Sequence, residues 1–218
     1  MKYKIEWNYK LKGKEVVSFR SDWLEAELAL LLGEDIEKSG KGTDIYYYDE
    51  IGTSWKTKEL KKLLAEIEEE PHDLIIFFDG GFNKDSNQAG IGVVIYYKQG
   101  KKKFRVRTNE IFDEIDNNNE AEYAAMYFAV NLLEEMDANH IACEFKGDSQ
   151  VVLMQLKGEW PCYDDNLNRW LDKIEEKIKK LSIHASYTPI TRSENKEADK
   201  LATQALEGKL INSKMQII

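Results

Sequence analysis

The sequence predicts a mixed α/β protein built from two consecutive units. Segments with the alternation or continuous apolar character of strands are interleaved with segments whose apolar residues recur every three or four positions, as in helices. The apolar run at 74–78 suits a strand buried on both faces, which is typical of the centre of an α/β sheet. The polar stretch EEEPHD at 68–73 separates this run from an earlier, smaller set of elements, and we place the domain boundary there.

Composition and charge narrow the class of protein. The 218 residues, of which 42% are hydrophobic and 33% charged, suffice for one large core or two modest ones. No apolar run near the N-terminus is long enough for a membrane span or a signal core, so we expect a cytoplasmic protein without a membrane partner. Cys143 and Cys162 form neither a disulfide framework nor a thiolate zinc motif. A net charge of -9 argues against a general nucleic-acid-coating protein, because such binding uses Lys and Arg.

Residues 1–70 predict a small α+β domain with the order ββαβα. The expected elements are strands at 3–9 and 14–20 joined by a turn at Gly13, a helix from Ser21-Asp22 to Lys38, a strand at 44–52 and a helix from Thr57. Four leucines recur at helical spacing in the first helix: Leu24, Leu28, Leu31 and Leu32. The unit carries 12 basic and 16 acidic side chains. We therefore expect it to bind a protein partner or to self-associate through an exposed sheet edge, and not to bind phosphates.

Residues 73–208 predict a second domain, a mixed five-stranded sheet with flanking helices. The expected strands lie at 74–78, 89–98, 101–112, 141–147 and 184–190, and the expected helices at 119–136, 149–156, 164–181 and 194–206. Residues 209–218 are expected to form a frayed tail.

Four acidic residues of this second unit occupy positions where a merely solvated charge would be unusual. Asp79 ends the most apolar strand, and strand ends commonly build active sites. Glu122 borders the buried stripe of its helix, whereas Glu120 is expected to face solvent. Asp199 is the inward-facing candidate of the last helix. Asp148 ends a strand just before a helix, where a helix cap and a catalytic carboxylate fit equally well.

These four acids predict a metal site. Carboxylates that converge on one spot repel one another unless a cation neutralises them. Oxygen-only ligands select hard ions such as Mg²⁺ or Mn²⁺, and Mg²⁺ typically shares carboxylates with substrate phosphate oxygens. Two ions about 3.5–4 Å apart can activate a water and stabilise the leaving oxygen in an in-line displacement.

The sequence resembles the type 1 ribonuclease H family through four motifs in the family's order. These are FFDGGF around Asp79, NNNEAEYAA around Glu122, GDSQVV around Asp148 and SENKEADKLA around Asp199. The likeness is strongest to bacterial ribonuclease H-like proteins with an additional small N-terminal domain. It implies a ribonuclease H-like fold and cleavage of the RNA strand of RNA/DNA hybrids, which leaves 5′-phosphate and 3′-hydroxyl ends. It also implies that Asp79 bridges two Mg²⁺ or Mn²⁺ ions, that Glu122 and Asp148 join one, and that Asp199 joins the other.

The resemblance further implies substrate contacts. Four residues match family positions at which the hybrid is contacted, near the minor groove where a ribose 2′-OH identifies RNA: Gly80, Asn118, Asn119 and Gln150. Helix capping and a surface amide are the alternatives for the three amide side chains. The family's better-known members carry a His in the loop before the last acid, whereas this chain has Thr191-Arg192-Ser193. We expect Arg192 to hold a phosphate there; a surface ion pair with Glu194 is the alternative.

Two other functions stay open. A catalytically weak or inactive ribonuclease H-fold module that binds nucleic acid or protein would account for the net acidity, the missing loop His and the unfamiliar N-terminal domain. A two-metal nuclease of the same superfamily that acts on DNA agrees less well with NNNEAEY and GDSQ, which resemble the ribonuclease branch more closely.

Overall fold

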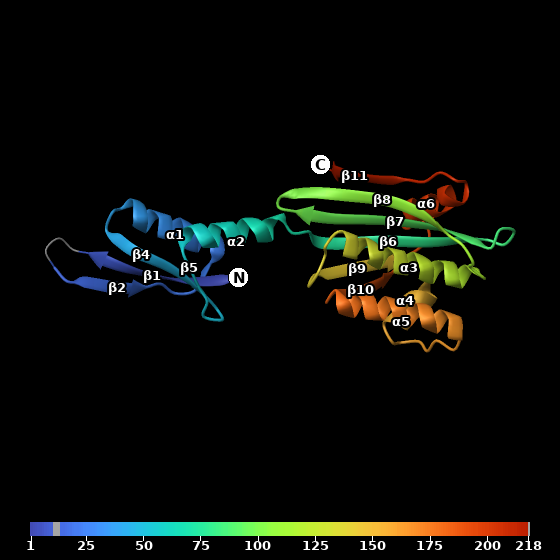
Figure 1. Cartoon of the computed structure of the whole chain (residues 1–218), viewed down its shortest axis with the longest axis horizontal. Helices are drawn as coiled ribbons and strands as arrows, with labels where there is room; N and C mark the ends of the chain where they lie inside the picture. The colour runs from blue at the N-terminus through green and yellow to red at the C-terminus, as the bar shows by residue number, and fades with distance from the viewer. Residues whose placement is uncertain (11–13, 218) are drawn as a thin grey trace. The chain divides into compact units, whose positions relative to one another are not determined.

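The computed structural model describes residues 1–10 and 14–217, so the expected turn at Gly13 lies outside the described residues. The chain divides into two compact units, Met1–Glu69 and Glu70–Ile218, which run from blue to teal and from green to red in Figure 1. Each unit has its own hydrophobic core. Within the described part of the chain, none of the helices combines the length and the apolar character needed to cross a membrane.

The first unit is an antiparallel sheet against which two helices pack. Its elements are β1 (Lys2–Lys10), β2 (Val16–Arg20), β3 (Leu24–Glu25), α1 (Ala26–Lys38), β4 (Gly42–Asp49), β5 (Ser54–Trp55) and α2 (Thr57–Glu69). The strand order is β2-β1-β4-β5, and β3 pairs with β1. The fully buried core residues are Tyr3, Ile5, Ala29, Tyr47 and Leu60. The ββαβα order is therefore extended by two very short strands, β3 and β5.

Helix α1 differs from the expectation in its start and in its buried face. It begins at Ala26 and not at the expected cap near Ser21. The Ser21 hydroxyl instead accepts a hydrogen bond from the backbone N–H of Ile5, which holds this segment against β1. Leu28 and Leu31 are 54% and 65% exposed. The leucine spacing thus predicted a helix correctly without indicating which of its faces the sheet covers.

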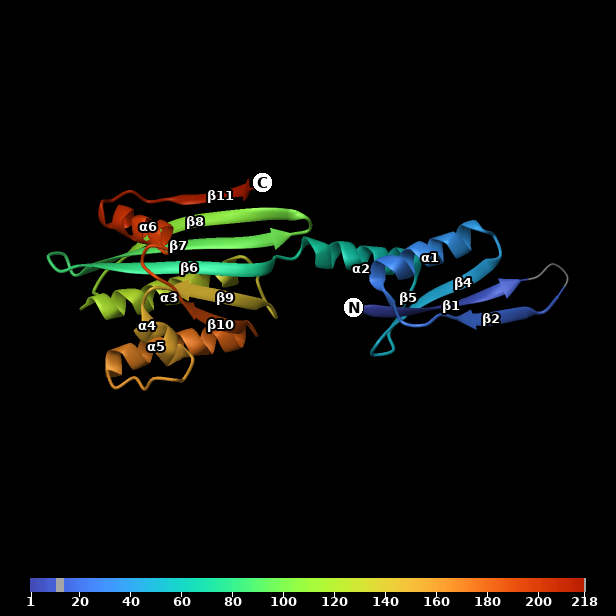
Figure 2. The ribbon, with the colours of Figure 1, turned by 180° about the vertical axis from the view of Figure 1, so that it is seen from behind.

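The second unit is a six-stranded mixed sheet with helices on both faces. Its elements are β6 (His72–Asn83), β7 (Gln88–Gln99), β8 (Lys102–Phe112), α3 (Asn118–Glu135), β9 (Ala142–Gly147), α4 (Gln150–Leu156), α5 (Asp165–Lys180), β10 (His184–Pro189), α6 (Lys196–Leu206) and β11 (Asn212–Ile217). The strand order is β10-β9-β6-β7-β8-β11. Strand β9 is parallel to β6 and β10, and the other pairs are antiparallel. Helices α3 and α5 lie on one face and α6 on the other (Figure 1 and Figure 2).

The mixed sheet agrees with the prediction, but it has six strands instead of five. Residues Asn212–Ile217, expected in a frayed tail, form β11 antiparallel to β8. Asn109 on β8 holds the chain that leads to this strand. Its side-chain amide donates hydrogen bonds to the carbonyls of Leu201 and Lys209, and its Oδ1 accepts one from the N–H of Ile211. The tail is thus ordered by a residue about a hundred positions away, which local patterns in the tail do not reveal.

Two glycines allow helices to approach the central strands from both faces. A Cβ at Gly80 on β6 would lie 2.1 Å from the carbonyl oxygen of Ala121, so the first turn of α3 lies directly against that strand. A Cβ at Gly92 on β7 would lie 2.1 Å from the carbonyl oxygen of Ala198 in α6. Gly92 is also the cross-strand partner of Asp79. The close packing of both helices therefore brings their first turns to the position of Asp79.

Candidate functional site

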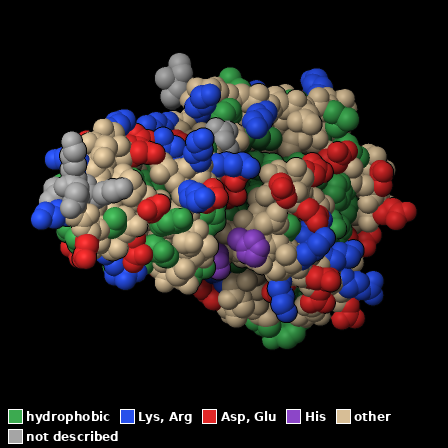
Figure 3. Space-filling view, turned by 60° about the vertical axis from the view of Figure 1, so that its left-hand side comes forward, with side chains coloured by type: hydrophobic (Ala, Val, Ile, Leu, Met, Phe, Trp, Pro, Cys, Tyr) green, Lys and Arg blue, Asp and Glu red, His purple; other side chains and the backbone are tan. Residues whose placement is uncertain are grey.

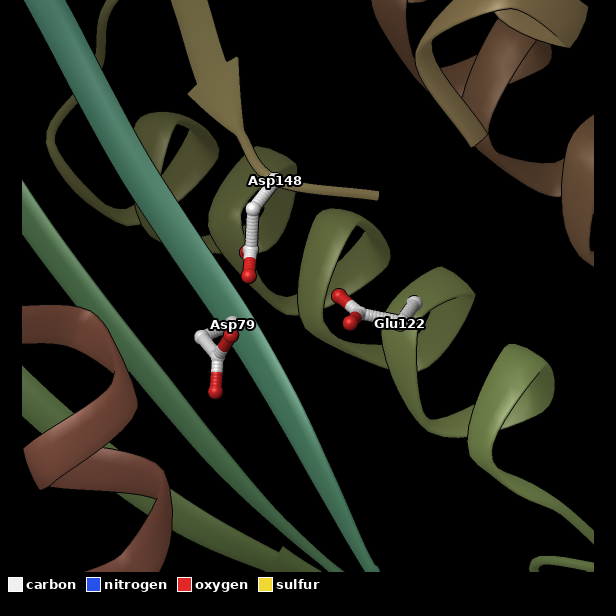
Figure 4. A group of neighbouring side chains, drawn as sticks. All are labelled: Asp79, Glu122 and Asp148. Atoms are coloured by element: carbon white, nitrogen blue, oxygen red, sulfur yellow. The ribbon is translucent and has the colours of Figure 1, made fainter. Parts of the chain in front are cut away.

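Three carboxylates from three different elements meet beside the end of β9. Asp79 comes from β6, Glu122 from α3 and Asp148 from the residue directly after β9 (Figure 4). Each offers an oxygen atom, and these atoms lie within 4.8 Å of one another. We expected strand β6 to end at Asp79, but it continues to Asn83 in pairing with β7. Its other neighbour, β9, ends at Gly147. One side of β6 therefore has no neighbouring strand at Asp79, because β9 ends there and not because β6 does.

Asp79 and Glu122 are shielded from water, and burial and neighbouring negative charges disfavour their ionisation. Asp79 and Glu122 are only 7% and 8% exposed. Burial, followed by the negative charges of Asp148 and Asp199, raises the pKa of Asp79 to about 7. Burial, followed by the charges of Asp79 and Asp148, holds the pKa of Glu122 well above its usual range. The Oε2 atom of Glu122 is buried and has no hydrogen-bond partner among the described residues.

A divalent cation fits this arrangement. The donors are carboxylate oxygens, which hard ions such as Mg²⁺ and Mn²⁺ prefer. A cation between them would offset the burial and repulsion that raise the pKa values of Asp79 and Glu122. It would also give the orphaned Oε2 of Glu122 a partner, which a buried polar atom ordinarily has.

Asp199, the fourth expected ligand, lies at the margin of this group. Its charge raises the pKa of Asp79, yet its side chain is 32% exposed. Its Oδ1 accepts a hydrogen bond from the guanidinium of Arg192 at 2.6 Å. Arg192 does not pair with Glu194, which was the alternative; Glu194 accepts hydrogen bonds from the backbone and hydroxyl of Thr191. Arg192 thus holds Asp199, and a metal would compete with it for this carboxylate.

Asn195 is a site residue that the sequence analysis missed. It is 1% exposed, and its Nδ2 donates to the carbonyl of Phe78 at 2.9 Å and to Oδ1 of Asp148 at 2.8 Å. It therefore fixes Asp148 relative to the strand that carries Asp79. An Asn just before a helix is ordinarily a cap, which conceals this role in the sequence. Asp148 accepts this bond, and the N-cap of α4 is Ser149, so Asp148 is not the helix cap that was considered.

Glu120 contradicts the expectation that it faces solvent, because it is only 4% exposed. Its carboxylate accepts hydrogen bonds from the backbone of Asp116 at 2.8 Å, the amide of Asn166 at 2.8 Å and the indole of Trp170 at 2.9 Å. The last two donors belong to α5, which packs against α3. Helical spacing placed Glu122 towards the sheet, but it could not show that a second helix covers the neighbouring face of α3.

The amide side chains expected to contact substrate lie at the starts of two helices beside the carboxylates. Asn118 and Asn119 begin α3, and Gln150 begins α4. All three are exposed, and their side chains make no hydrogen bond to another described residue. Asn117 caps α3, since its side chain accepts a hydrogen bond from the N–H of Glu120 at 3.0 Å. The two following asparagines are therefore not occupied in capping the helix.

Comparisons with known proteins agree with this fold. A family model described as reverse transcriptase-like matches residues 77–205. The chain is 42% identical over 214 residues to the uncharacterized protein YpeP of Bacillus subtilis (strain 168), across 98% of this chain and 94% of that protein. It is 32% identical over 133 residues to a ribonuclease HI of Halobacterium salinarum, across 60% of this chain and 63% of that enzyme.

Solved structures of RNase H1 proteins are also similar in fold to this chain. RNase H1 from the halophilic archaeon Halobacterium salinarum NRC-1 superimposes with a TM-score of 0.54 at 29% identity, and covers 62% of this chain and 98% of its own. LC11-RNase H1 in complex with an RNA/DNA hybrid gives a TM-score of 0.54 at 26% identity, with the same coverage of both chains. The family match lies within the second unit and spans more than half of the sequence. The chain therefore belongs to the type 1 ribonuclease H family of hydrolases.

Proposed function

We propose that this protein is a metal-dependent endoribonuclease that hydrolyses the RNA strand of RNA/DNA hybrids and leaves 5′-phosphate and 3′-hydroxyl ends. The observation that carries the proposal is the convergence of Asp79, Glu122 and Asp148, with a buried Glu122 oxygen that has no described partner, in a domain of this family. The hybrid complex of LC11-RNase H1, a relative in fold, supports the choice of substrate.

The four acids would hold two Mg²⁺ or Mn²⁺ ions: Asp79 both, Glu122 and Asp148 one, and Asp199 the other. When bound, such ions lower the pKa of a coordinated water and stabilise negative charge on the leaving oxygen. Asn195 keeps Asp148 in place through its 2.8 Å hydrogen bond. If a cation took the place of Arg192 at Asp199, the guanidinium of Arg192 would be free to bind a phosphate through two hydrogen bonds.

The exposed amides at the starts of α3 and α4 are proposed to recognise the hybrid. Asn118, Asn119 and Gln150 offer unused donors and acceptors, and the ribose 2′-OH that distinguishes RNA from DNA both donates and accepts. Lys and Arg side chains (blue) and Asp and Glu side chains (red) lie interspersed on the visible face in Figure 3. Because the chain also carries a net charge of -9, recognition by a few local polar contacts suits this protein better than attraction by a broad basic field.

Cleavage of a fluorescently labelled RNA/DNA hybrid in Mg²⁺ or Mn²⁺ tests the proposal. We expect the RNA strand to be cut to products with 5′-phosphate ends, while RNA and DNA duplexes of the same sequence stay intact. The Asp79→Asn variant, purified in the same way, controls for contaminating nucleases. A well-folded protein that leaves the hybrid intact with both metals would overturn the proposal.

Two observations favour a second candidate, a catalytically weak or inactive module that binds nucleic acid or protein. The 2.6 Å bond from Arg192 occupies Asp199, and the adjoining loop carries Thr191-Arg192-Ser193 in place of a His. Such a protein would bind the hybrid saturably in metal without cutting it. Fluorescence anisotropy and the cleavage assay on the same samples separate the two candidates.

A further inference from the structure

Strand β2 forms one edge of the sheet in the first unit, and its side chains are unprotected. Every residue of β2 is exposed, and Val16, Val17 and Phe19 are 53%, 52% and 46% exposed. Proteins ordinarily prevent such an edge from pairing with another chain by a charge in mid-strand, a proline, a bulge or a covering element. Strand β2 carries only Arg20, at its end, and pairs with β1 without a shift in register. It is therefore an apolar edge that is available to another strand.

The hydrogen-bond pattern shows which backbone groups of β2 point outward. The N–H of Ser21 donates to the carbonyl of Ile5 on β1 at 2.9 Å. In an antiparallel pair, residues that bond to the neighbouring strand alternate with residues that do not. Counting back from Ser21, the backbone groups of Arg20, Ser18 and Val16 point away from β1. These groups need partners from water or from a further strand.

We propose that β2 pairs antiparallel with β2 of a second copy of this chain, about a two-fold axis at Ser18, so that the two sheets become one. In this register Ser18 faces its own counterpart, Val17 faces the copy's Phe19, and Lys14 faces the copy's Asp22. Apolar residues thus oppose each other at Val17 and Phe19, and opposite charges oppose each other at Lys14 and Asp22, while Val16 lies opposite the copy's Arg20. A two-fold pairing uses the same surface on both partners and closes as a dimer. This self-complementarity favours a second copy over an unrelated strand.

Phe19 supplies much of the apolar surface for this contact. Its ring stacks on Trp7 with centroids 5.6 Å apart and meets Tyr9 edge-on at 6.0 Å. Nearly half of Phe19 nevertheless remains exposed. In the proposed register the copy's Val17 would cover this exposed part. Pairs of aromatic and β-branched residues opposite each other are among the contacts that stabilise antiparallel strands.

The molar mass of the full chain in solution tests the proposal. We expect the mass to rise with concentration from 25.3 kDa towards twice that value, measured by light scattering after size exclusion and by sedimentation velocity. Ser18→Pro removes an outward N–H and no backbone hydrogen bond to β1, and Pro is tolerated at such edge positions. It also removes the 2.8 Å hydrogen bond from the Ser18 hydroxyl to Oδ1 of Asn8 on β1. Val17→Lys places a charge against the copy's Phe19. Each change should raise the dissociation constant of the dimer by about tenfold or more.

Leu31→Lys is the matched control, because it replaces an apolar residue that is 65% exposed on α1, outside the edge. It should leave the dimer unchanged. Circular dichroism checks that each variant is folded. If Ser18→Pro unfolds the first unit, the effect of Val17→Lys on the dimer tests the proposal alone. A parent chain that stays at 25.3 kDa at every concentration, a dimer that survives the folded edge variants, or a dimer that Leu31→Lys disrupts equally would overturn the proposal. No hybrid is used, so the outcome is independent of the proposed activity.

Discussion

Asp79→Asn is expected to stabilise the metal-free protein while abolishing hybrid cleavage. The change keeps the volume of the side chain but removes a charge that is buried and repelled by Asp148 and Asp199. Raising the pKa from 3.8 to about 7 corresponds to about 4 kcal/mol, since each pKa unit is worth about 1.4 kcal/mol. This value is an upper limit for the gain, because the amide introduces donors that also need partners.

The stabilisation has a defined dependence on pH. Between pH 3.8 and about 7, Asp79 ionises in the unfolded chain but keeps its proton in the folded one. The parent protein therefore loses stability as the pH rises through this window, and above a pH of about 7 the loss is complete. Asn has no proton to lose. The advantage of the variant should thus grow from about pH 4 to about pH 7 and then level off.

Thermal unfolding in EDTA at low and high pH measures this effect. For a unit of this size 1 kcal/mol shifts Tm by about 2–4 °C, so the variant should melt up to roughly 8–16 °C higher than the parent above neutral pH. The difference should fall to about a third of this near pH 5. Mg²⁺ should raise the Tm of the parent more than that of the variant. Asp172→Asn, at an exposed position of α5, is the control. An equal Tm difference at both pH values, or cleavage by the variant at the parent's rate, would refute the reasoning.

Four other changes in the second unit have expected outcomes. Glu120→Gln should lower the free energy of unfolding by about 1–3 kcal/mol in urea titrations, because the carboxylate accepts from three donors and an amide cannot; an unchanged midpoint would contradict this. Asn195→Ala should lower kcat about tenfold or more with little change in KM, because Asp148 loses its donor, and an unaltered kcat would remove Asn195 from the site. Arg192→Ala should lower turnover partly and weaken hybrid binding, less so at high salt, whereas kinetics equal to the parent's would identify a passive surface arginine. A fragment of residues 70–218 should fold and keep metal-dependent cleavage; a fragment that is folded by circular dichroism yet inactive at saturating hybrid and metal would show that the first unit is required.

The sequence by itself determined the class of fold and the three carboxylates that converge. Asp79 follows an apolar run of residues, Glu122 borders a helical stripe, and Asp148 lies where a strand meets a helix. Each of these positions is recognisable from residues only a few places away, because the side-chain periods of strands and helices are local properties. The same local periods indicated the other helices and strands within a few residues of their observed boundaries, but not the short strands β3 and β5 or the C-terminal strand β11.

Only the tertiary structure decided which faces and edges are covered. Glu120 is buried because α5 packs on α3, and Asn195 bonds Asp148 because the start of α6 lies against the end of β9. Leu31 stays exposed because no described element packs on that face of α1, while the C-terminal strand is ordered through Asn109. A local pattern shows that a segment has an apolar or polar side. The surface that meets this side comes from residues distant in the sequence, so its identity appears only once the chain is packed.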